Sequence, residues 1–265
     1  MYVKLLSFRQ YLHSIWVRRD LIAYMVRSNL KLSTARTFFG YLWWAIDPLL
    51  YMTVYYILVE VIFNRGGENF AAYLFIALIP WKWTISSIVD GTGSINSNAG
   101  IINQLPLPKV IFPINHVLVN TFRFLVGTVV LLAFLIVYGI PITPYIVLFP
   151  IIMAVQFAFL LAVALIFALL GTFFRDIKNM IQYGLRLWFY LSPGLYMIDR
   201  VPEPLQPFLW VNPITHFFVG YRDLLLYHRF PDFTGLVIIL VLSVALIVIG
   251  LQLFRKYEGE FAKVV

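Results

Sequence analysis

The chain has 265 residues, of which 62% are hydrophobic and 12% are charged, against about 45–50% and 25% in soluble proteins. A chain this apolar has no way to cover its hydrophobic surface in water, which excludes a soluble globular protein and predicts an integral membrane protein. Its formal net charge is +8, and because the basic residues divide by membrane side, topology and anionic lipid account for this charge and no nucleic-acid partner is expected.

Residues 1–36 are basic and partly amphipathic. Lys and Arg occur seven times in this segment, and its only acid is Asp20. The pattern predicts a helix that lies in the membrane interface, and the alternative is a mobile tail. The apolar residues that recur at helical spacing in its first half are Leu5, Phe8, Leu12 and Ile15.

The first membrane span is predicted at residues 37–63, which carry two acids, Asp47 and Glu60, and no basic residue. A helix of these 27 residues is about 40 Å long, whereas the hydrocarbon core of a bilayer is about 30 Å thick. Further apolar runs follow, separated by polar or Pro-containing turns. The six predicted spans cover approximately residues 38–63, 70–89, 112–139, 145–173, 180–198 and 233–254.

Residues 199–232 break this pattern, because five prolines divide them into apolar stretches about half as long as a span. Segments of about 10–14 apolar residues are too short to cross a bilayer. We therefore expect an outer re-entrant helical hairpin between spans five and six. The predicted fold is an all-α polytopic membrane protein, with a cytoplasmic or interfacial segment at 1–36 and a membrane domain at 37–265.

Six spans place both termini on one side of the membrane. In this arrangement thirteen of the 20 Lys and Arg residues fall on the side of the termini, four fall on the other side, and three lie inside spans. Cytoplasmic loops carry the excess of Lys and Arg in membrane proteins. Both termini are therefore predicted to be cytoplasmic.

Short motifs in a characteristic order run along nearly the whole chain. They are RTFFGYLW at 36–43 followed by Asp47-Pro48, Ile79-Pro80-Trp81, LPLPKVIFP at 105–113, Phe174-Arg175-Asp176-Ile177, Asn212-Pro213 followed by Arg222, and the tail at 254–261. In this order and spacing they resemble the permease subunits of ABC transporters that export polysaccharides such as O-antigen, capsule or teichoic acid.

The resemblance implies a multi-pass protein of the bacterial plasma (inner) membrane that forms half of a transporter. Two copies enclose a pathway, two ABC-type ATPase subunits bind ATP and Mg, and a lipid-linked glycan moves outward from the cytoplasmic side. This chain has no G-x-x-x-x-G-K-[ST] motif, so no nucleotide or other cofactor is expected on it; membrane lipid is its remaining partner. The alternatives are an ABC exporter of drugs or lipids and, in a different class, a membrane-embedded glycosyltransferase.

Neither a catalytic nor a metal site is expected. The three histidines outside the N-terminal segment lack the spacing and acidic company of a zinc site, and no Ser-His-Asp order with a nucleophile elbow is present. A glycosyltransferase would need converging carboxylates, whereas the outer acids lie in Pro-rich turns. The histidines are His116, His216 and His228, and the acids are Asp199, Glu203, Asp223 and Asp232.

Aromatic and cationic residues inside the spans are the candidates for the substrate pathway. Aromatic rings offer apolar faces to the C–H groups of sugars, and Tyr and Trp add a polar atom. The alternative for these aromatic residues is an interfacial belt or helix packing. The candidates are Tyr55, Tyr56, Trp81, Phe189, Tyr190, Tyr196, Arg123 and Arg186.

Charged side chains within spans are costly, at roughly 2.5–3.5 kcal/mol each at the bilayer centre, so we do not expect them to face lipid. We hypothesise that Asp47 pairs with Arg123, and the alternative is that Arg123 or Arg186 contacts the diphosphate of a lipid carrier. The full set is Asp47, Lys82, Asp90, Arg123 and Arg186.

Two cytoplasmic connections, at residues 93–110 and 174–179, are placed to receive force from an ATPase. Short connections between rigid helices transmit a push because they do not absorb it by bending. The alternative is that their basic residues only fix the topology. The coupling candidates are Lys109, Arg175, Asp176 and Lys178.

Overall fold

The computed structural model describes residues 7–35, 37–64, 66–174 and 176–264, and every regular element within these ranges is a helix. The predicted all-α class is therefore confirmed. The α-helices are α1 (Phe8–Val17), α2 (Arg19–Thr34), α3 (Trp43–Tyr56), α4 (Phe70–Thr92), α5 (Ala99–Gln104), α6 (Ile111–Val137), α7 (Phe149–Phe173), α8 (Ile177–Leu191), α9 (Gln206–Val211), α10 (Pro213–Leu225) and α11 (Phe233–Val264).

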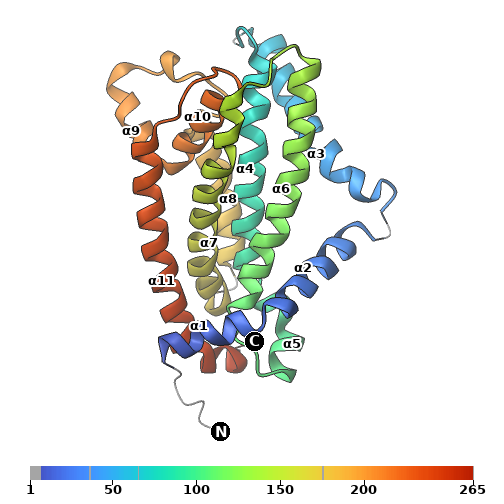
Figure 1. Ribbon diagram of the computed structural model, residues 1–265, viewed down its shortest axis with the longest axis vertical. Coiled ribbons are helices and arrows are strands. Elements are labelled where there is room, and N and C mark those ends of the chain that lie inside the picture. The colour runs from blue at the N-terminus through green and yellow to red at the C-terminus, as the bar shows by residue number, and fades with distance from the viewer. Residues whose placement is uncertain (1–6, 36, 65, 175, 265) are drawn as a thin grey trace.

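Five of the described helices, with their flanking turns, are long and apolar enough to cross a membrane, and four of these, α4, α6, α7 and α11, run lengthwise through one bundle with α3 at its edge (Figure 1). α4 contacts α3, α6, α7, α8 and α10. Its residues from Phe70 to Trp81 are all buried, because FAAYLFIALIPW presents apolar side chains on every side of the helix. The five segments are Gly40–Ile62, Phe70–Thr92, Ile111–Val137, Pro144–Phe173 and Phe233–Phe261.

The predicted fifth span, at residues 180–198, corresponds mainly to α8, which has 15 residues. Such a helix is about 22 Å long, shorter than the hydrocarbon core of about 30 Å. α8 packs along α4 and α7, while α1 and the end of α11 lie at one end of the bundle (Figure 1). The chain between them must therefore traverse the bundle an even number of times. This arrangement supports the predicted count of six spans, which stays a prediction. The cytoplasmic location of the termini also stays a prediction.

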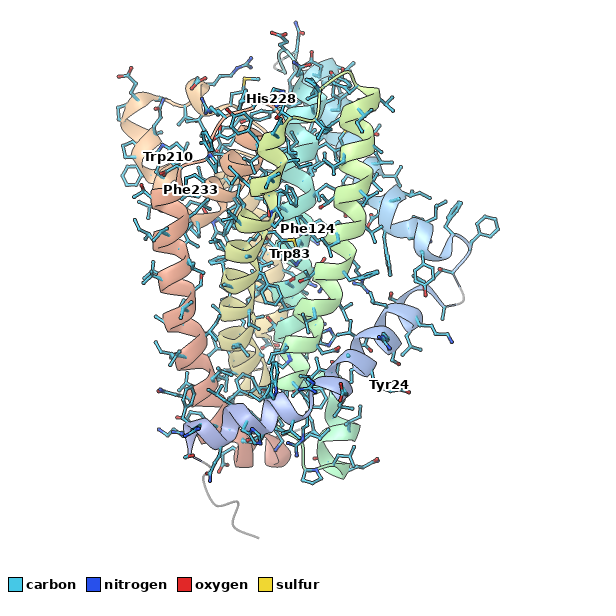
Figure 2. The ribbon with its side chains drawn as sticks, in the orientation of Figure 1. Tyr24, Trp83, Phe124, Trp210, His228 and Phe233 are labelled. Atoms are coloured by element: carbon cyan, nitrogen blue, oxygen red, sulfur yellow. The ribbon has the colours of Figure 1, made fainter. Side chains whose placement is uncertain are left out.

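The N-terminal segment forms two helices. A capping box begins α1, because Ser7 Oγ accepts a hydrogen bond from the backbone N–H of Gln10 and Gln10 Oε1 accepts one from that of Ser7. Tyr11 is buried against the bundle, whereas Trp16 and Tyr24 are exposed, and Figure 2 shows Tyr24 pointing outward from α2. α1 and α2 therefore each have one buried and one exposed face, as expected for helices that lie in the membrane interface.

The Pro-rich stretch 199–232 contains α9 and α10, at the end of the bundle opposite α1 (Figure 1). In α10 the fully buried Arg222 donates hydrogen bonds to the carbonyl oxygens of Tyr73 (3.1 Å), Pro193 (2.6 Å) and Gly194 (3.0 Å). This arginine ties α10 to the start of α4 and to the connection after α8. The expected half-length helices are present, and the depth to which they enter a membrane stays a prediction.

Candidate functional site

A cavity of about 590 Å³ lies between α3, α4 and α8. Its lining residues recur at helical spacing, so one face of each helix forms a wall. A volume of this size falls in the usual range for ligand sites, about 300–1,000 Å³. The wall consists of Asp47, Pro48, Tyr51 and Tyr55 from α3, of Leu78, Trp81, Lys82, Ile85, Ser86, Val89 and Asp90 from α4, and of Gln182, Arg186, Phe189 and Tyr190 from α8.

Five of the predicted pathway residues meet in this cavity. Trp81 stacks on Phe189 with ring centroids 5.1 Å apart, and Phe189 lies 5.8 Å from the rings of Tyr55 and Tyr190. Arg186 lies one helical turn before Phe189 and lines the same cavity. The structure therefore brings together side chains that are more than 100 residues apart in the sequence.

The other three predicted pathway residues lie outside this wall. Tyr56 is half-buried and packs against the hydrophobic core, because it is turned by about 100° from Tyr55 on the helix. Tyr196 lies in the connection after α8, where its hydroxyl donates to the carbonyl oxygen of Leu191 (3.1 Å). Arg123 lies on α6 and lines a second cavity, which shares Asp47 and Lys82 with the first.

Asp47 forms an ion pair with Lys82 of α4. Among the described residues no ion pair joins Asp47 to Arg123, so the hypothesised pairing is wrong. α3 packs mainly on α4 at this level, which puts Lys82 closer to the carboxylate. The Lys82 Nζ also lies 5.5 Å from the centre of the Tyr51 ring. Lys82 is the one cation within the predicted second span, but Arg123 of the third span lies at comparable depth, so the spacing alone did not identify this pair.

A second cavity, of about 280 Å³, lies beside the first and is lined by residues of α2, α3, α4 and α6. Arg123 Nη1 donates to Asn120 Oδ1 (3.1 Å), and Asn120 Nδ2 donates to Asp90 Oδ2 (3.0 Å). Asp47 and Lys82 line both cavities. The ion pair therefore lies where the two cavities adjoin. Figure 2 shows Trp83 and Phe124 next to one another at this second cavity, and their rings stack at 4.3 Å.

Three of the predicted coupling residues, Lys109, Asp176 and Lys178, lie at the end of the bundle where α1 and α5 lie. Lys109 is bound within the chain: its backbone N–H donates to Glu258 Oε1 (2.8 Å) and its Nζ to the Glu258 carbonyl oxygen (2.6 Å). Burial lowers the pKa of the Lys109 ammonium, and the Glu258 carboxylate partly offsets this effect. Asp176 and Lys178 are exposed, and Arg175 lies outside the described residues.

The two connections predicted to be cytoplasmic, at residues 93–110 and 174–179, lie close to one another. Asn96 Nδ2 donates to the carbonyl oxygen of Gly171 (2.9 Å), and a Cβ atom on Gly93 would lie 3.2 Å from Lys178 Nζ. α5 projects from this end of the bundle (Figure 1), and Ile101 within it is exposed. A push on either connection would therefore reach both.

Residues 22–226 match the family model described as ABC-2 type transporter. The chain is 30% identical over 246 residues to the O-antigen export system permease protein RfbA of Klebsiella pneumoniae, which covers 92% of this chain and 95% of that protein. The protein of the same name from Myxococcus xanthus is 29% identical over 247 residues, with coverage of 92% and 95%. The polysialic acid transport protein KpsM of Escherichia coli is 21% identical over 225 residues, with coverage of 83% and 86%.

Proposed function

The chain belongs to the ABC-2 type transporter family, and we propose that it is the membrane subunit of an exporter that moves a lipid-linked polysaccharide outward from the cytoplasmic side. The relatives named above are permeases or transport proteins for O-antigen and polysialic acid, and none is named as an enzyme. The full-length match to these relatives supports the same class of cargo for this chain.

The cavity between α3, α4 and α8 is the observation that carries the proposal. It combines stacked aromatic rings with two cations, Lys82 and Arg186. Aromatic faces pack against the C–H faces of sugars, and Lys and Arg donate charge-assisted hydrogen bonds to phosphate. A lipid-linked glycan carries both groups. Many weak ring contacts also let a polymer slide, whereas a few strong contacts would hold it in place.

We place a second copy of the chain against the outer faces of α3 and α8. The Asp47 and Lys82 side chains are 42% and 35% exposed, and lipid against them would meet a charge in the bilayer interior at a cost of roughly 2.5–3.5 kcal/mol each. A second copy that closes this side around a polar path removes that cost. It would also cover exposed apolar residues, among them Val54 of α3 and Leu187 of α8.

We place two ATPase subunits against α5 and the connection around Lys178. These segments lie at the same end of the bundle. Asn96, just before α5, donates to the carbonyl oxygen of Gly171 near the end of α7, and Gly93 lies close to Lys178, so ATP-driven closure of the ATPase pair would move the cytoplasmic ends of α4 and α7 together. ATP and Mg are held by the ATPase subunits in this proposal.

Purification of the chain with its natural partners tests the proposed function. We expect an ABC-type ATPase to accompany it, and we expect a lipid-linked glycan to raise ATP hydrolysis in proteoliposomes. Stimulation by a lipid or a drug without a glycan would favour the alternative exporter. A chain that transports cargo without a nucleotide-binding partner would contradict the proposal.

A further inference from the structure

We infer that Lys82 binds the diphosphate group of a polyprenyl lipid in the cavity between α3, α4 and α8, and that Asp47 competes with this diphosphate for the lysine. The inference rests on the proposed function and deepens it, because it names the binding cation and a carboxylate that opposes binding. It starts from the ion pair that α3 and α4 form at the boundary of the two cavities.

Lys82 is placed for an anion that arrives beside the aromatic wall. It follows Trp81 directly in the chain, and Trp81 stacks on Phe189 of α8 at 5.1 Å. Arg186 precedes Phe189 by three residues and therefore lies on the same helix face. The Trp81 ring stacks on the Phe189 ring between α4 and α8, and the two cations line the same cavity as these rings.

The charges around the cavity favour an anion only when Asp47 is displaced or neutralised. The cavity lining holds two cations, Lys82 and Arg186, and two carboxylates, Asp47 and Asp90, while Arg123 lines the adjoining cavity and donates to Asn120. Asp90 already accepts a hydrogen bond from Asn120 (3.0 Å). Asp47 is the carboxylate that holds Lys82, so it is the one that an incoming diphosphate must displace.

Lysine suits such an exchange. Its ammonium is a compact charge on a flexible stem, so it can pass from one acceptor to another. A diphosphate ester offers more negative charge and more acceptor oxygens than one carboxylate, and charge-assisted hydrogen bonds to such oxygens are the strong ones. The Lys82 side chain is 35% exposed, so its ammonium reaches the cavity without a rearrangement of α4.

Release of Asp47 would also alter how α3 is held to α4. The ion pair lies roughly 15 Å along α4 from its cytoplasmic end at Thr92. It is the one ion pair between α3 and α4 among the described residues. Binding of the lipid diphosphate would therefore loosen the edge helix that we place against the second copy.

Equilibrium binding of polyprenyl probes to the full-length chain in neutral detergent tests the inference. The probes are geranylgeranyl diphosphate, geranylgeraniol and inorganic pyrophosphate, and no ATPase or glycan is present. Lys82→Gln should weaken binding of the diphosphate lipid about tenfold or more and leave geranylgeraniol unchanged. Asp47→Asn should tighten binding of the diphosphate lipid several-fold, because it removes the competitor, as expected for charge pairs whose coupling exceeds about 1.5 kcal/mol.

Two further variants keep the result interpretable. Lys82→Gln leaves the Asp47 carboxylate unpaired, which destabilises the fold. The double variant Asp47→Asn with Lys82→Gln, in which both groups are neutral, should fold and still bind weakly. Lys256→Gln removes an exposed lysine near the C-terminal end of α11, outside both cavities. This variant should bind the diphosphate lipid as the unmodified chain does. Thermal unfolding of each variant measures its folding separately.

Weaker binding to Asp47→Asn, or unchanged binding to the double variant, would overturn the inference. Inorganic pyrophosphate that binds as tightly as the lipid would overturn the assignment to a lipid head group. If the binding assay contradicts the role of Lys82, the transport assay of the unmodified complex still tests the proposed function. If the complex does not transport a glycan, the binding assay still tests the role of Lys82. The two proposals can therefore fail separately.

Discussion

Gly171→Ala is the substitution for which the structure predicts the clearest loss of stability. Gly171 lies near the end of α7, where α7 meets the end of α4. A Cβ atom there would lie 2.4 Å from the carbonyl oxygen of Thr92 and 2.8 Å from its Cγ2. The nearest neighbour is backbone, so the two helices must separate to admit the methyl group.

The expected cost follows from two opposing effects. Overpacking of this kind lowers the free energy of unfolding by about 1–3 kcal/mol. Replacing a helical glycine by alanine raises it by about 0.5–1 kcal/mol. The middle of each range gives a net loss of about 1.2 kcal/mol, which corresponds to a fall of roughly 2–5 °C in the unfolding midpoint for a chain of this size. Adding Thr92→Ala should recover only part of this loss, because the closest contact is with the backbone oxygen.

Thermal unfolding in detergent measures this effect, with Gly184→Ala as the matched control. Gly184 lies within α8, and a Cβ atom there meets nothing within 4 Å, so its substitution should leave the midpoint unchanged or raise it. Equal shifts for the two variants would refute the close approach of α4 and α7. The same assay in the presence of the ATPase would tell whether separating these helix ends also weakens coupling.

Three further predictions use the same preparation. Tyr190→Ala removes an exposed ring from the cavity, so it should lower glycan-stimulated ATP hydrolysis several-fold and change stability by less than about 0.5 kcal/mol; unchanged stimulation would contradict the aromatic wall. Arg222→Met should lower the unfolding free energy by about 2–4 kcal/mol, because carbonyl oxygens of the connection after α8 lose their donor, and an unchanged midpoint would contradict this role. The pKa of Lys109 is lowered by burial, so the unfolded chain binds its proton more tightly and stability should rise as the pH increases between the lowered pKa and the ordinary value near 10.4. Lys109→Met should abolish that rise in the unfolding midpoint as the pH approaches the ordinary value near 10.4, and a rise that persists would assign it to another group.

Most of the helical framework was predictable because apolar runs of more than 20 residues have one stable form in a bilayer. The exception is α8, whose apolar run is interrupted by Gln182 and Arg186 and stops at Ser192-Pro193-Gly194. The break between α1 and α2 at Arg18 has no proline or glycine to mark it. It depends on packing of α1 against α11 and of α2 against α6, which only the fold reveals.

The candidate site was predictable by residue type and only partly by position. Helical spacing alone places Tyr51 and Tyr55, four residues apart, on the cavity face and turns Tyr56 away from the cavity. The partner of Asp47 was not predictable, because Lys82 and Arg123 lie at comparable depth and the order of helices around α4 decides between them.

Photocrosslinking in living cells tests most directly whether the glycan passes the cavity between α3, α4 and α8. Tyr190, which lines the cavity, would be replaced by photoreactive benzoylphenylalanine, and Val244, exposed on α11, would receive the same group as the control. We predict a covalent adduct that carries glycan at position 190 and none at position 244. A glycan adduct at position 244 alone, or at neither position in cells that export the polymer, would contradict the account.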